Sequence, residues 1–180
     1  MDEHRLALDA QQGDREAFAV LAGVYYDRLH RWLYHLTRDR HAAEDLTQET
    51  LLKAFAALDR FRAGTNFRAW LFRIAYNSFV NQRRVVARQK ESLPEHLPDD
   101  EEGPPEQAVA RETRELLAAA VRRLPPDFRG AFLLRVEEGL SFREIANILN
   151  LTEETARWRV FKARQRLLRT LSPPLEQEKP

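Results

Sequence analysis

The sequence predicts an all-α protein with two small helical domains, and three observations support this. Glycine is scarce, with 6 in 180 residues, and no stretch shows the sustained alternation of a half-buried strand. Residues on both sides of a central segment, 91–107, instead look helical. That segment contains four prolines and seven acids, which oppose helix formation and collapse. We therefore expect an N-terminal domain over 1–90, a flexible acidic linker over 91–107, a C-terminal domain over 108–171 and a tail over 172–180.

The N-terminal domain is expected to contain three helices. Their expected limits are Asp14 to about Thr37, about His41 to Phe61, and Thr65 or Asn66 through Arg84 and somewhat beyond. Aspartate, threonine and asparagine side chains can accept hydrogen bonds from the free amides at a helix start. Gly64 separates the last two helices.

The C-terminal domain is expected to contain helices near 108–124, 126–137, 141–149 and 152–171. Ser141 and Glu144 have the spacing of a capping box, in which each side chain bonds a free amide of the same helix start. Asn150 tolerates a left-handed conformation, and Thr152 can cap the next helix. Two short helices joined by such a turn predict a helix-turn-helix.

The second helix of this pair has the side chains that a DNA-recognition helix needs, which are cations for phosphates and residues that reach base edges. A solvated basic face is the alternative interpretation. Trp158 is equally consistent with a DNA contact and with packing against another helix. The candidates for duplex DNA binding are Thr155, Arg157, Trp158, Arg159 and Lys162.

The third helix of the N-terminal domain predicts a polar stripe along one side. Amides between arginines, beside an aromatic ring, suit single-stranded DNA, because cations hold phosphates while amides and rings contact unpaired bases. A solvated face is again the alternative. The stripe comprises Trp70, Arg73, Asn77, Asn81 and Arg84.

The second helix begins with an acidic surface, which is unusual in a protein that binds nucleic acid. Glu44, Asp45 and Glu49 surround Gln48, and Asp45 and Glu49 lie one turn apart. Two explanations remain open, which are stabilisation of the helix dipole and contact with a protein partner that carries arginines.

Composition argues against an enzyme and against an exported or membrane protein. There is no cysteine, the five histidines lack metal-ligand spacing, and no glycine-rich phosphate loop or nucleophile motif occurs. We expect no catalytic residue, metal or cofactor. No apolar signal or membrane-spanning segment is evident, so a cytoplasmic location is expected. The net charge of +1 is the sum of +4 over 1–90, −7 over 91–107, +5 over 108–170 and −1 over 171–180. This distribution fits two modules that face a polyanion, and equally fits ordinary solvated surfaces around a disordered linker.

Taken together, these segments resemble the extracytoplasmic-function (ECF) sigma factors. The matching segments, in order and at family spacing, are Phe18 to Leu36, Ala43 to Ala54, Phe67 to Asn77, Leu124-Pro125 and Glu138 to Ala146. The resemblance implies a factor that binds core RNA polymerase and promoter DNA, with an anti-sigma factor as a candidate partner. A stand-alone helix-turn-helix regulator is the alternative, and the segment from Asp45 to Glu49 argues against it.

The resemblance also implies roles for particular positions. Asp45, Gln48 and Glu49 match the motif that docks on the clamp helices of the polymerase. Asn77 and Asn81 match positions near the extruded base of the −10 element. The helix-turn-helix would read the −35 element as duplex and touch the polymerase flap, and the linker would run through the cleft.

Three departures from the family pattern affect the expected DNA preference. Asn81 stands where many members have aspartate, and Asn150 stands in place of a glycine. The segment from Glu153 to Arg159, which includes Trp158, differs from the commoner recognition-helix sequence. The preferred −35 sequence therefore cannot be transferred from relatives.

Overall fold

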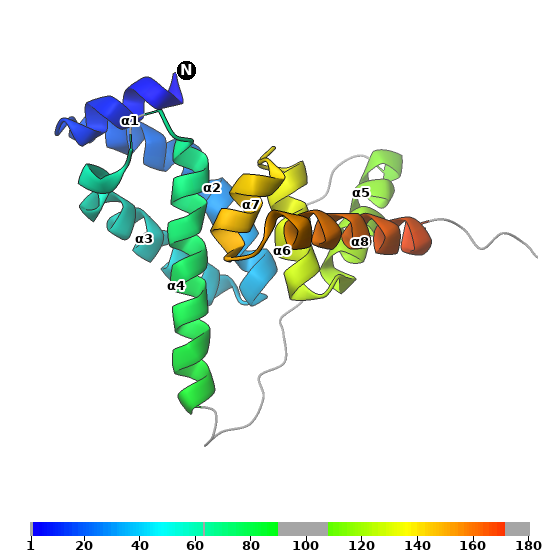
Figure 1. Cartoon of the computed structure of the whole chain (residues 1–180). Coiled ribbons are helices and arrows are strands. Elements are labelled where there is room, and N and C mark those ends of the chain that lie inside the picture. Colours follow the sequence, from blue (N-terminus) through cyan, green and yellow to red (C-terminus); the bar gives the residue numbers. More distant parts are fainter. Residues whose placement is uncertain (1, 63, 90–107, 172–180) are drawn as a thin grey trace, which may run out of the picture.

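The computed structural model describes residues 2–62, 64–89 and 108–171, so the expected linker and tail lie outside the described residues. Within those ranges every regular element is helical, which confirms the all-α prediction (Figure 1). The N-terminal helices are α1 (Glu3–Gln11), α2 (Arg15–Thr37), α3 (Arg40–Ala56), a short 3-10 turn (Leu58–Arg60) and α4 (Phe67–Gln89). The C-terminal helices are α5 (Ala108–Arg123), α6 (Pro126–Val136), α7 (Phe142–Leu149) and α8 (Glu153–Leu171).

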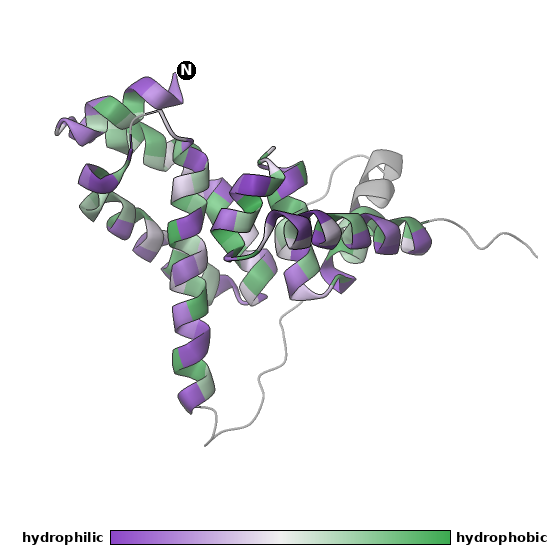
Figure 2. Cartoon of the chain, in the orientation of Figure 1, coloured by the Kyte–Doolittle hydropathy of each residue, from purple (hydrophilic) through white to green (hydrophobic). Residues whose placement is uncertain are grey.

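The N-terminal domain packs α2, α3 and α4 around a shared apolar core. Trp32 is 1% exposed, and its ring meets Phe72 edge to face with centroids 5.3 Å apart. As predicted, the Asp14 carboxylate caps α2, accepting hydrogen bonds from two backbone amides at 2.9 and 3.1 Å. Figure 2 shows apolar and hydrophilic residues side by side along most helices, as expected where one face packs and the other is solvated.

Two features of this domain differ from the sequence-based expectation. Helix α1 was not expected, and it packs on α2 with Ala7 and Ala10 buried. Its last residue, Gln11, donates side-chain hydrogen bonds to the carbonyls of Leu58 (2.9 Å) and Phe61 (2.7 Å). Helix α3 ends at Ala56 and not at Phe61, because the chain turns there and buries the Phe61 ring to 2% exposure.

The C-terminal domain contains the expected helix-turn-helix. The Ser141 hydroxyl accepts from the Glu144 amide (3.2 Å), and the Glu144 carboxylate accepts from the Ser141 amide (2.7 Å), so the capping box is confirmed. Asn150 ends α7 with φ 55°, and Thr152 accepts from the Thr155 amide at the start of α8 (3.2 Å). These local signals fix the angle between α7 and α8.

The two domains are in direct contact. Helix α6 packs on α2 and α7 packs on α4, while the last turns of α4 project beyond the rest of the molecule (Figure 1). The Trp32 indole N–H donates to the Gly130 carbonyl across the contact (3.2 Å). A Cβ atom at Gly130 would lie 3.0 Å from Leu36 Cδ2, so a residue without a side chain allows the close approach of α6 to α2. We call this packing of α6 and α7 on α2 and α4 the closed arrangement.

No helix in the described ranges is long and apolar enough to cross a membrane.

Candidate polymerase and nucleic-acid interfaces

The acidic end of α3 presents its charged side chains to solvent. Asp45, Gln48 and Glu49 are all exposed, although Glu49 pairs with Lys53 one turn later. On the opposite face, Thr47 and Thr50 are fully buried, and their hydroxyls donate to backbone carbonyls within α3. Helix α3 is therefore fixed by its buried face and leaves the acidic face free for a partner.

An exposed leucine extends this acidic surface, and sequence reasoning missed it. Leu52 lies one turn beyond Gln48 and Glu49, and its side chain is 71% exposed. The sequence does contain a signal for it, because a leucine on the polar side of an amphipathic helix indicates a contact surface. An apolar side chain bordered by acids is typical of a protein-docking surface and not of a nucleic-acid surface.

The predicted stripe on α4 is exposed along most of its length. Arg73, Asn77, Asn81 and Arg84 are exposed, and no ion pair is formed by either arginine within the described part of the chain. Trp70 differs from the others because it is half-buried. Its ring packs against Phe61 (5.4 Å between centroids) and Phe67 (5.5 Å). These two rings fix the indole, whose exposed part lies at the edge of the stripe.

The candidates on α8 fall into two groups. Arg157 and Trp158 are exposed; Arg157 is held by Glu153 (3.0 Å) and lies 5.3 Å from the centre of the Phe142 ring. Arg159 instead turns toward α6, where it pairs with Asp127 (3.3 Å) and is only 18% exposed. In the closed arrangement its guanidinium is therefore directed away from the outer face of α8.

The two remaining candidates on α8 are half-buried. Thr155 shares a hydrogen bond with the hydroxyl of Thr152 (2.8 Å), and Lys162 contacts Gln165 (3.4 Å). Of the two expected roles of Trp158, packing against another helix is observed, because its ring lies on Phe128 with centroids 5.4 Å apart. Half of its surface remains exposed, and the DNA contact stays a prediction.

A cavity of about 740 Å³ lies where the loop before α4 meets α7. Four arginines, contributed by both domains, line this cavity. None of them forms an ion pair with another described residue. Glu144 is the one acid in its lining. The excess of positive charge suits phosphate groups. The arginines are Arg60, Arg62, Arg73 and Arg143.

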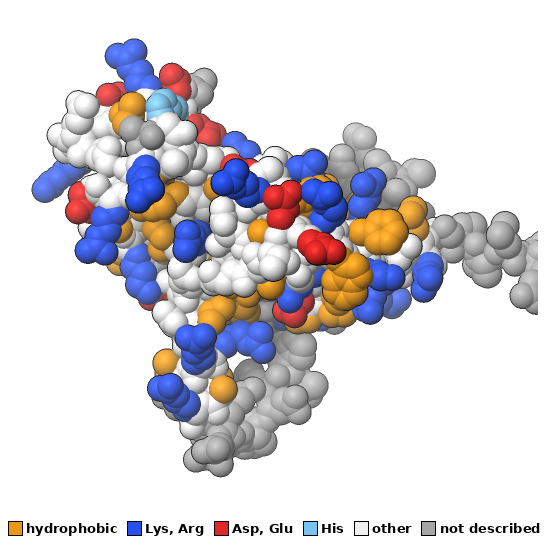
Figure 3. All heavy atoms as spheres, viewed as in Figure 1, with side chains coloured by type: hydrophobic (Ala, Val, Ile, Leu, Met, Phe, Trp, Pro, Cys, Tyr) orange, Lys and Arg blue, Asp and Glu red, His pale blue; other side chains and the backbone are white. Residues whose placement is uncertain are grey.

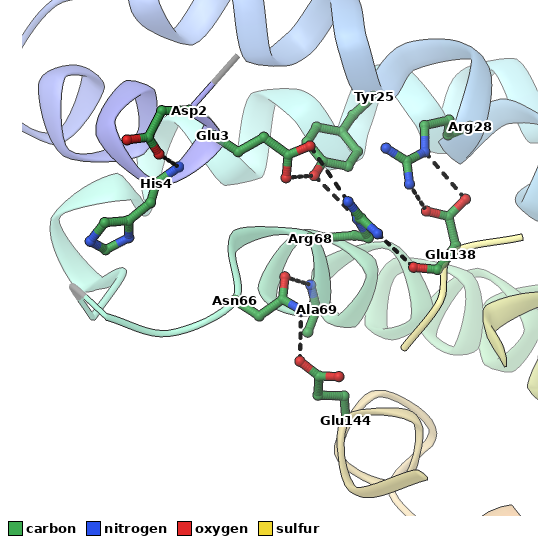
Figure 4. Close-up of polar contacts among 10 residues, drawn as sticks. All are labelled: Asp2, Glu3, His4, Tyr25, Arg28, Asn66, Arg68, Ala69, Glu138 and Glu144. Atoms are coloured by element: carbon green, nitrogen blue, oxygen red, sulfur yellow. Dashed lines mark hydrogen bonds and ion pairs between the residues drawn. The ribbon is translucent and has the colours of Figure 1, made fainter. Parts of the chain in front are cut away.

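A cluster of charged side chains around Glu138, shown in Figure 4, joins the two domains. Arg28 of α2 donates to the Glu138 carboxylate (2.5 Å), which is 4% exposed. Arg68 of α4 donates to the Glu138 carbonyl (2.6 Å) and pairs with Glu3 of α1 (3.5 Å). We call Arg28, Arg68 and Glu138 the Glu138 cluster. The cluster links α1, α2 and α4 to the turn between α6 and α7.

The Tyr25 hydroxyl completes this arrangement on the N-terminal side. It donates to Glu3 (2.6 Å) and accepts from Arg68 (3.4 Å). Burial, together with the nearby Glu3 carboxylate, raises the pKa of Tyr25 to about 12. Tyr25 therefore stays neutral and orients Arg68 toward Glu138.

A second polar contact joins the start of α4 to α7. The Asn66 side chain accepts from the Ala69 amide (3.3 Å) and donates to the Glu144 carboxylate (2.7 Å), as Figure 4 shows. Partial burial would raise the pKa of Glu144, but hydrogen bonds from Ser141 and Asn66 outweigh it and the pKa is lowered. Glu144 is thus the charged carboxylate that both caps α7 and contacts the other domain.

His35 lies at the domain contact among arginines from both sides. Burial, together with the nearby guanidiniums of Arg129, Arg122, Arg31 and Arg38, lowers the pKa of His35 to about 4. Arg129 is itself 2% exposed and donates to the carbonyls of Arg122 (2.7 Å) and Leu124 (3.2 Å). A proton on His35 would add another positive charge to this cluster.

The described residues contain no group of three or more histidines and acids that could hold a metal ion. Figure 3 shows lysine and arginine side chains over both domains on the visible face, with acids between them. The candidate surfaces are therefore suited to binding polyanions and a protein partner.

Comparison with known proteins identifies the family of the chain. Residues 21–89 match the family model of Sigma-70 region 2, and residues 114–167 match that of Sigma-70 region 4. The chain is 32% identical to the RNA polymerase sigma-H factor of Pseudomonas aeruginosa, over 97% of this chain and 96% of that protein. It is 30% identical to the ECF RNA polymerase sigma-E factor of Escherichia coli, over 91% of each chain. The chain belongs to the ECF sigma factors.

An ECF sigma factor binds core RNA polymerase and directs promoter recognition at the start of transcription. A solved structure, the sigma factor RpoE in complex with the anti-sigma factor NepR from Bartonella quintana, is 29% identical with a TM-score of 0.69. The match covers 86% of this sigma factor and 96% of the RpoE chain. The structure of CnrH with the cytosolic domain of CnrY is 25% identical with a TM-score of 0.67, over 94% and 96% of the two chains.

Proposed function

We propose that the two domains of this sigma factor divide the work of promoter recognition. The N-terminal domain docks on core polymerase through Asp45, Gln48 and Glu49 and binds the opened −10 element along the α4 stripe. The C-terminal domain reads the −35 element as duplex through α8. The observation that carries this proposal is the exposure of Arg73, Asn77, Asn81 and Arg84 along one side of a helix whose other side is buried.

The stripe suits separated strands better than duplex DNA. Its two amides, which can read unpaired base edges, lie between two arginines, and the half-buried Trp70 provides an aromatic surface for stacking. The exposed end of α8 has a helix-turn-helix context, which favours the major groove of a duplex.

The spacing of the two promoter elements requires the domains to separate. Elements centred at −10 and −35 are about 25 base pairs apart, which is roughly 85 Å at 3.4 Å per base pair. In the closed arrangement Asn66, at the start of α4, lies 2.7 Å from Glu144 of the helix-turn-helix. We infer that the closed arrangement is a free or inhibited form and that polymerase binds the factor with its domains apart.

The experiment that tests the division compares matched promoters with promoters carrying a mismatched −10 bubble. Asn81→Ala should slow opening and alter base preference on the matched template, and the bubble should rescue much of the opening defect because it supplies unpaired bases. Arg157→Ala should weaken binding to the upstream duplex, and the bubble should not rescue it. Each variant is assayed as holoenzyme by initiation and by permanganate reactivity of unpaired thymines.

Two outcomes would contradict the proposal. If Asn81→Ala opens the promoter and prefers the same bases as the wild type, the stripe is a solvated face and not a DNA-binding surface. Rescue of Arg157→Ala by the bubble would remove α8 from upstream duplex recognition. Gln12→Ala is the control, since Gln12 is an exposed amide after α1, outside both proposed DNA surfaces and outside the arginine-lined cavity.

Partner and location follow from family membership as further parts of the proposal. RpoE and CnrH were each solved in complex with another protein, NepR being an anti-sigma factor. We infer that this sigma factor also has an anti-sigma partner, that it has no catalytic activity of its own, and that it works in the cytoplasm beside core polymerase.

A further inference from the structure

An exposed aromatic side chain stands near the beginning of α8, on the side opposite the core. Trp158 is 50% exposed and Phe161 is 55% exposed, whereas Ala156, Val160 and Ala163 are buried on the inner face. At 100° per residue, Trp158 lies about 160° around the helix from Val160. Exposed apolar side chains that lie next to one another, unlike isolated ones, indicate a surface for a partner.

The Trp158 ring is fixed from one side and open on the other. It packs against Phe128 of α6, with centroids 5.4 Å apart and an angle of 51° between the planes. Phe128 is held in turn under the Arg166 guanidinium, 4.9 Å from the ring centre. The indole therefore presents an ordered surface, and little side-chain entropy remains to be lost on binding.

Cations on both sides of this aromatic surface favour duplex DNA as the occupant. An outer ridge of α8 spans about 80° on a helical projection and consists of Glu154 in the first turn, then Trp158, Phe161, Gln165 and Leu168. The cations lie on both borders, about 60–80° from its centre. An α-helix about 10–12 Å across fills the major groove, about 12 Å wide, so both borders would face phosphates while the ridge faces base edges. The bordering cations are Arg157 and Arg164 on one side and Lys162 and Arg169 on the other.

We propose that Trp158 reads the C5-methyl group of a thymine in the −35 element. This inference rests on the proposed location of α8 in the major groove. Trp158 is in the second turn of α8, and the first turns of a recognition helix reach base edges. Thymine is the one base that presents an apolar group there, and a cytosine would place its amino group unpaired against the indole.

The test uses holoenzyme and a −35 duplex selected from a random pool by the wild-type protein. Each thymine is replaced in turn by deoxyuracil, which removes the methyl group alone. At one position this should weaken binding about fourfold, as expected for one methyl group returned to water. Replacing that base pair by C·G should weaken binding further, and 5-methylcytosine there should recover part of the loss.

Two variants assign the effect to Trp158. In Trp158→Ala the difference between thymine and deoxyuracil should disappear. In Leu168→Ala it should persist, because Leu168 is 66% exposed on the same ridge but lies ten residues, about 15 Å, further along the helix. Arg157→Ala reports separately on whether α8 occupies the groove at all.

These outcomes separate the inference from the proposal beneath it. If Arg157→Ala weakens binding but every deoxyuracil substitution is silent, methyl recognition is overturned and the location of α8 stands. If neither Arg157→Ala nor Trp158→Ala affects promoter binding, both fail. If Trp158→Ala leaves DNA binding intact and weakens binding to core polymerase, the ridge is a protein-docking surface and the inference is wrong.

Discussion

Removing one arginine should open the closed arrangement without unfolding either domain. Arg28→Ala would leave the Glu138 carboxylate, 4% exposed, without its closest cation. Breaking a buried ion pair from one side typically costs about 3–5 kcal/mol. Arg28 is itself 26% exposed, so we expect about 2–3 kcal/mol here, which shifts the equilibrium toward open forms by about 30- to 150-fold. The penalty falls on the closed form alone, because opening hydrates Glu138.

Single-molecule energy transfer measures this shift directly. The chain has no cysteine, so Gln12→Cys and Thr170→Cys, both at exposed positions, place one dye on each domain. Arg28→Ala should increase the population with low transfer efficiency while far-UV circular dichroism stays unchanged. The charge-swapped pair Arg28→Glu with Glu138→Arg should recover part of the closed population.

The control is Arg5→Ala, which breaks an exposed ion pair within α1, with side chains 80% and 42% exposed. Such pairs contribute about 0–1 kcal/mol, so the transfer distribution should not change. An unchanged distribution in Arg28→Ala, with the fold intact, would show that the Glu138 cluster does not hold the domains together.

Three further predictions concern other parts of the molecule. Replacing Asp45 and Glu49 by lysine should abolish co-purification with core polymerase while helicity is kept. Replacing the exposed Glu16 and Asp27 by lysine should leave co-purification unchanged. If the first variant co-purifies with core polymerase at wild-type yield, the docking assignment is wrong. In the closed form the pKa of His35 is about 4, so this form binds fewer protons than a form with that side chain solvated. Closure should therefore weaken as pH falls from about 6.5 toward 4, by at most roughly 3 kcal/mol. His35→Gln should remove this pH dependence in the same energy-transfer assay. Asn150→Ala should lower the free energy of unfolding by about 1 kcal/mol because φ is 55° there, and Asn150→Gly should not; equal urea midpoints for the three proteins would contradict this.

Local sequence signals predicted the parts of the fold that local physics determines. The caps at Asp14, Ser141 and Thr152 and the left-handed Asn150 all act within a few residues of chain, and the structure confirms each of them. Apolar periodicity likewise located the buried face of α8. The stripe on α4 could be predicted because exposure follows from helical spacing once the buried face is known.

Tertiary contacts decided what the sequence could not show. Helix α1 is short and polar, and it depends on Gln11 reaching backbone carbonyls 47 and 50 residues away. The half-burial of Trp70 depends on Phe61, which lies before the break in the chain. Arg159 follows Trp158 in a basic helix, yet Asp127 of another helix turns it inward.

The contact between the domains is the largest feature that periodicity could not predict, because it joins residues as far apart as Arg28 and Glu138. Its polar side chains nevertheless belong to elements that are stabilised without it. Glu144 keeps its bonds to Ser141 when Asn66 leaves, and Asn66 keeps its bond to the Ala69 amide. Arg68 retains Glu3 and Tyr25 within the N-terminal domain. Separation therefore removes bonds between the domains while these bonds within each domain remain, so we expect each domain to keep its caps when a partner that binds both of them separates them.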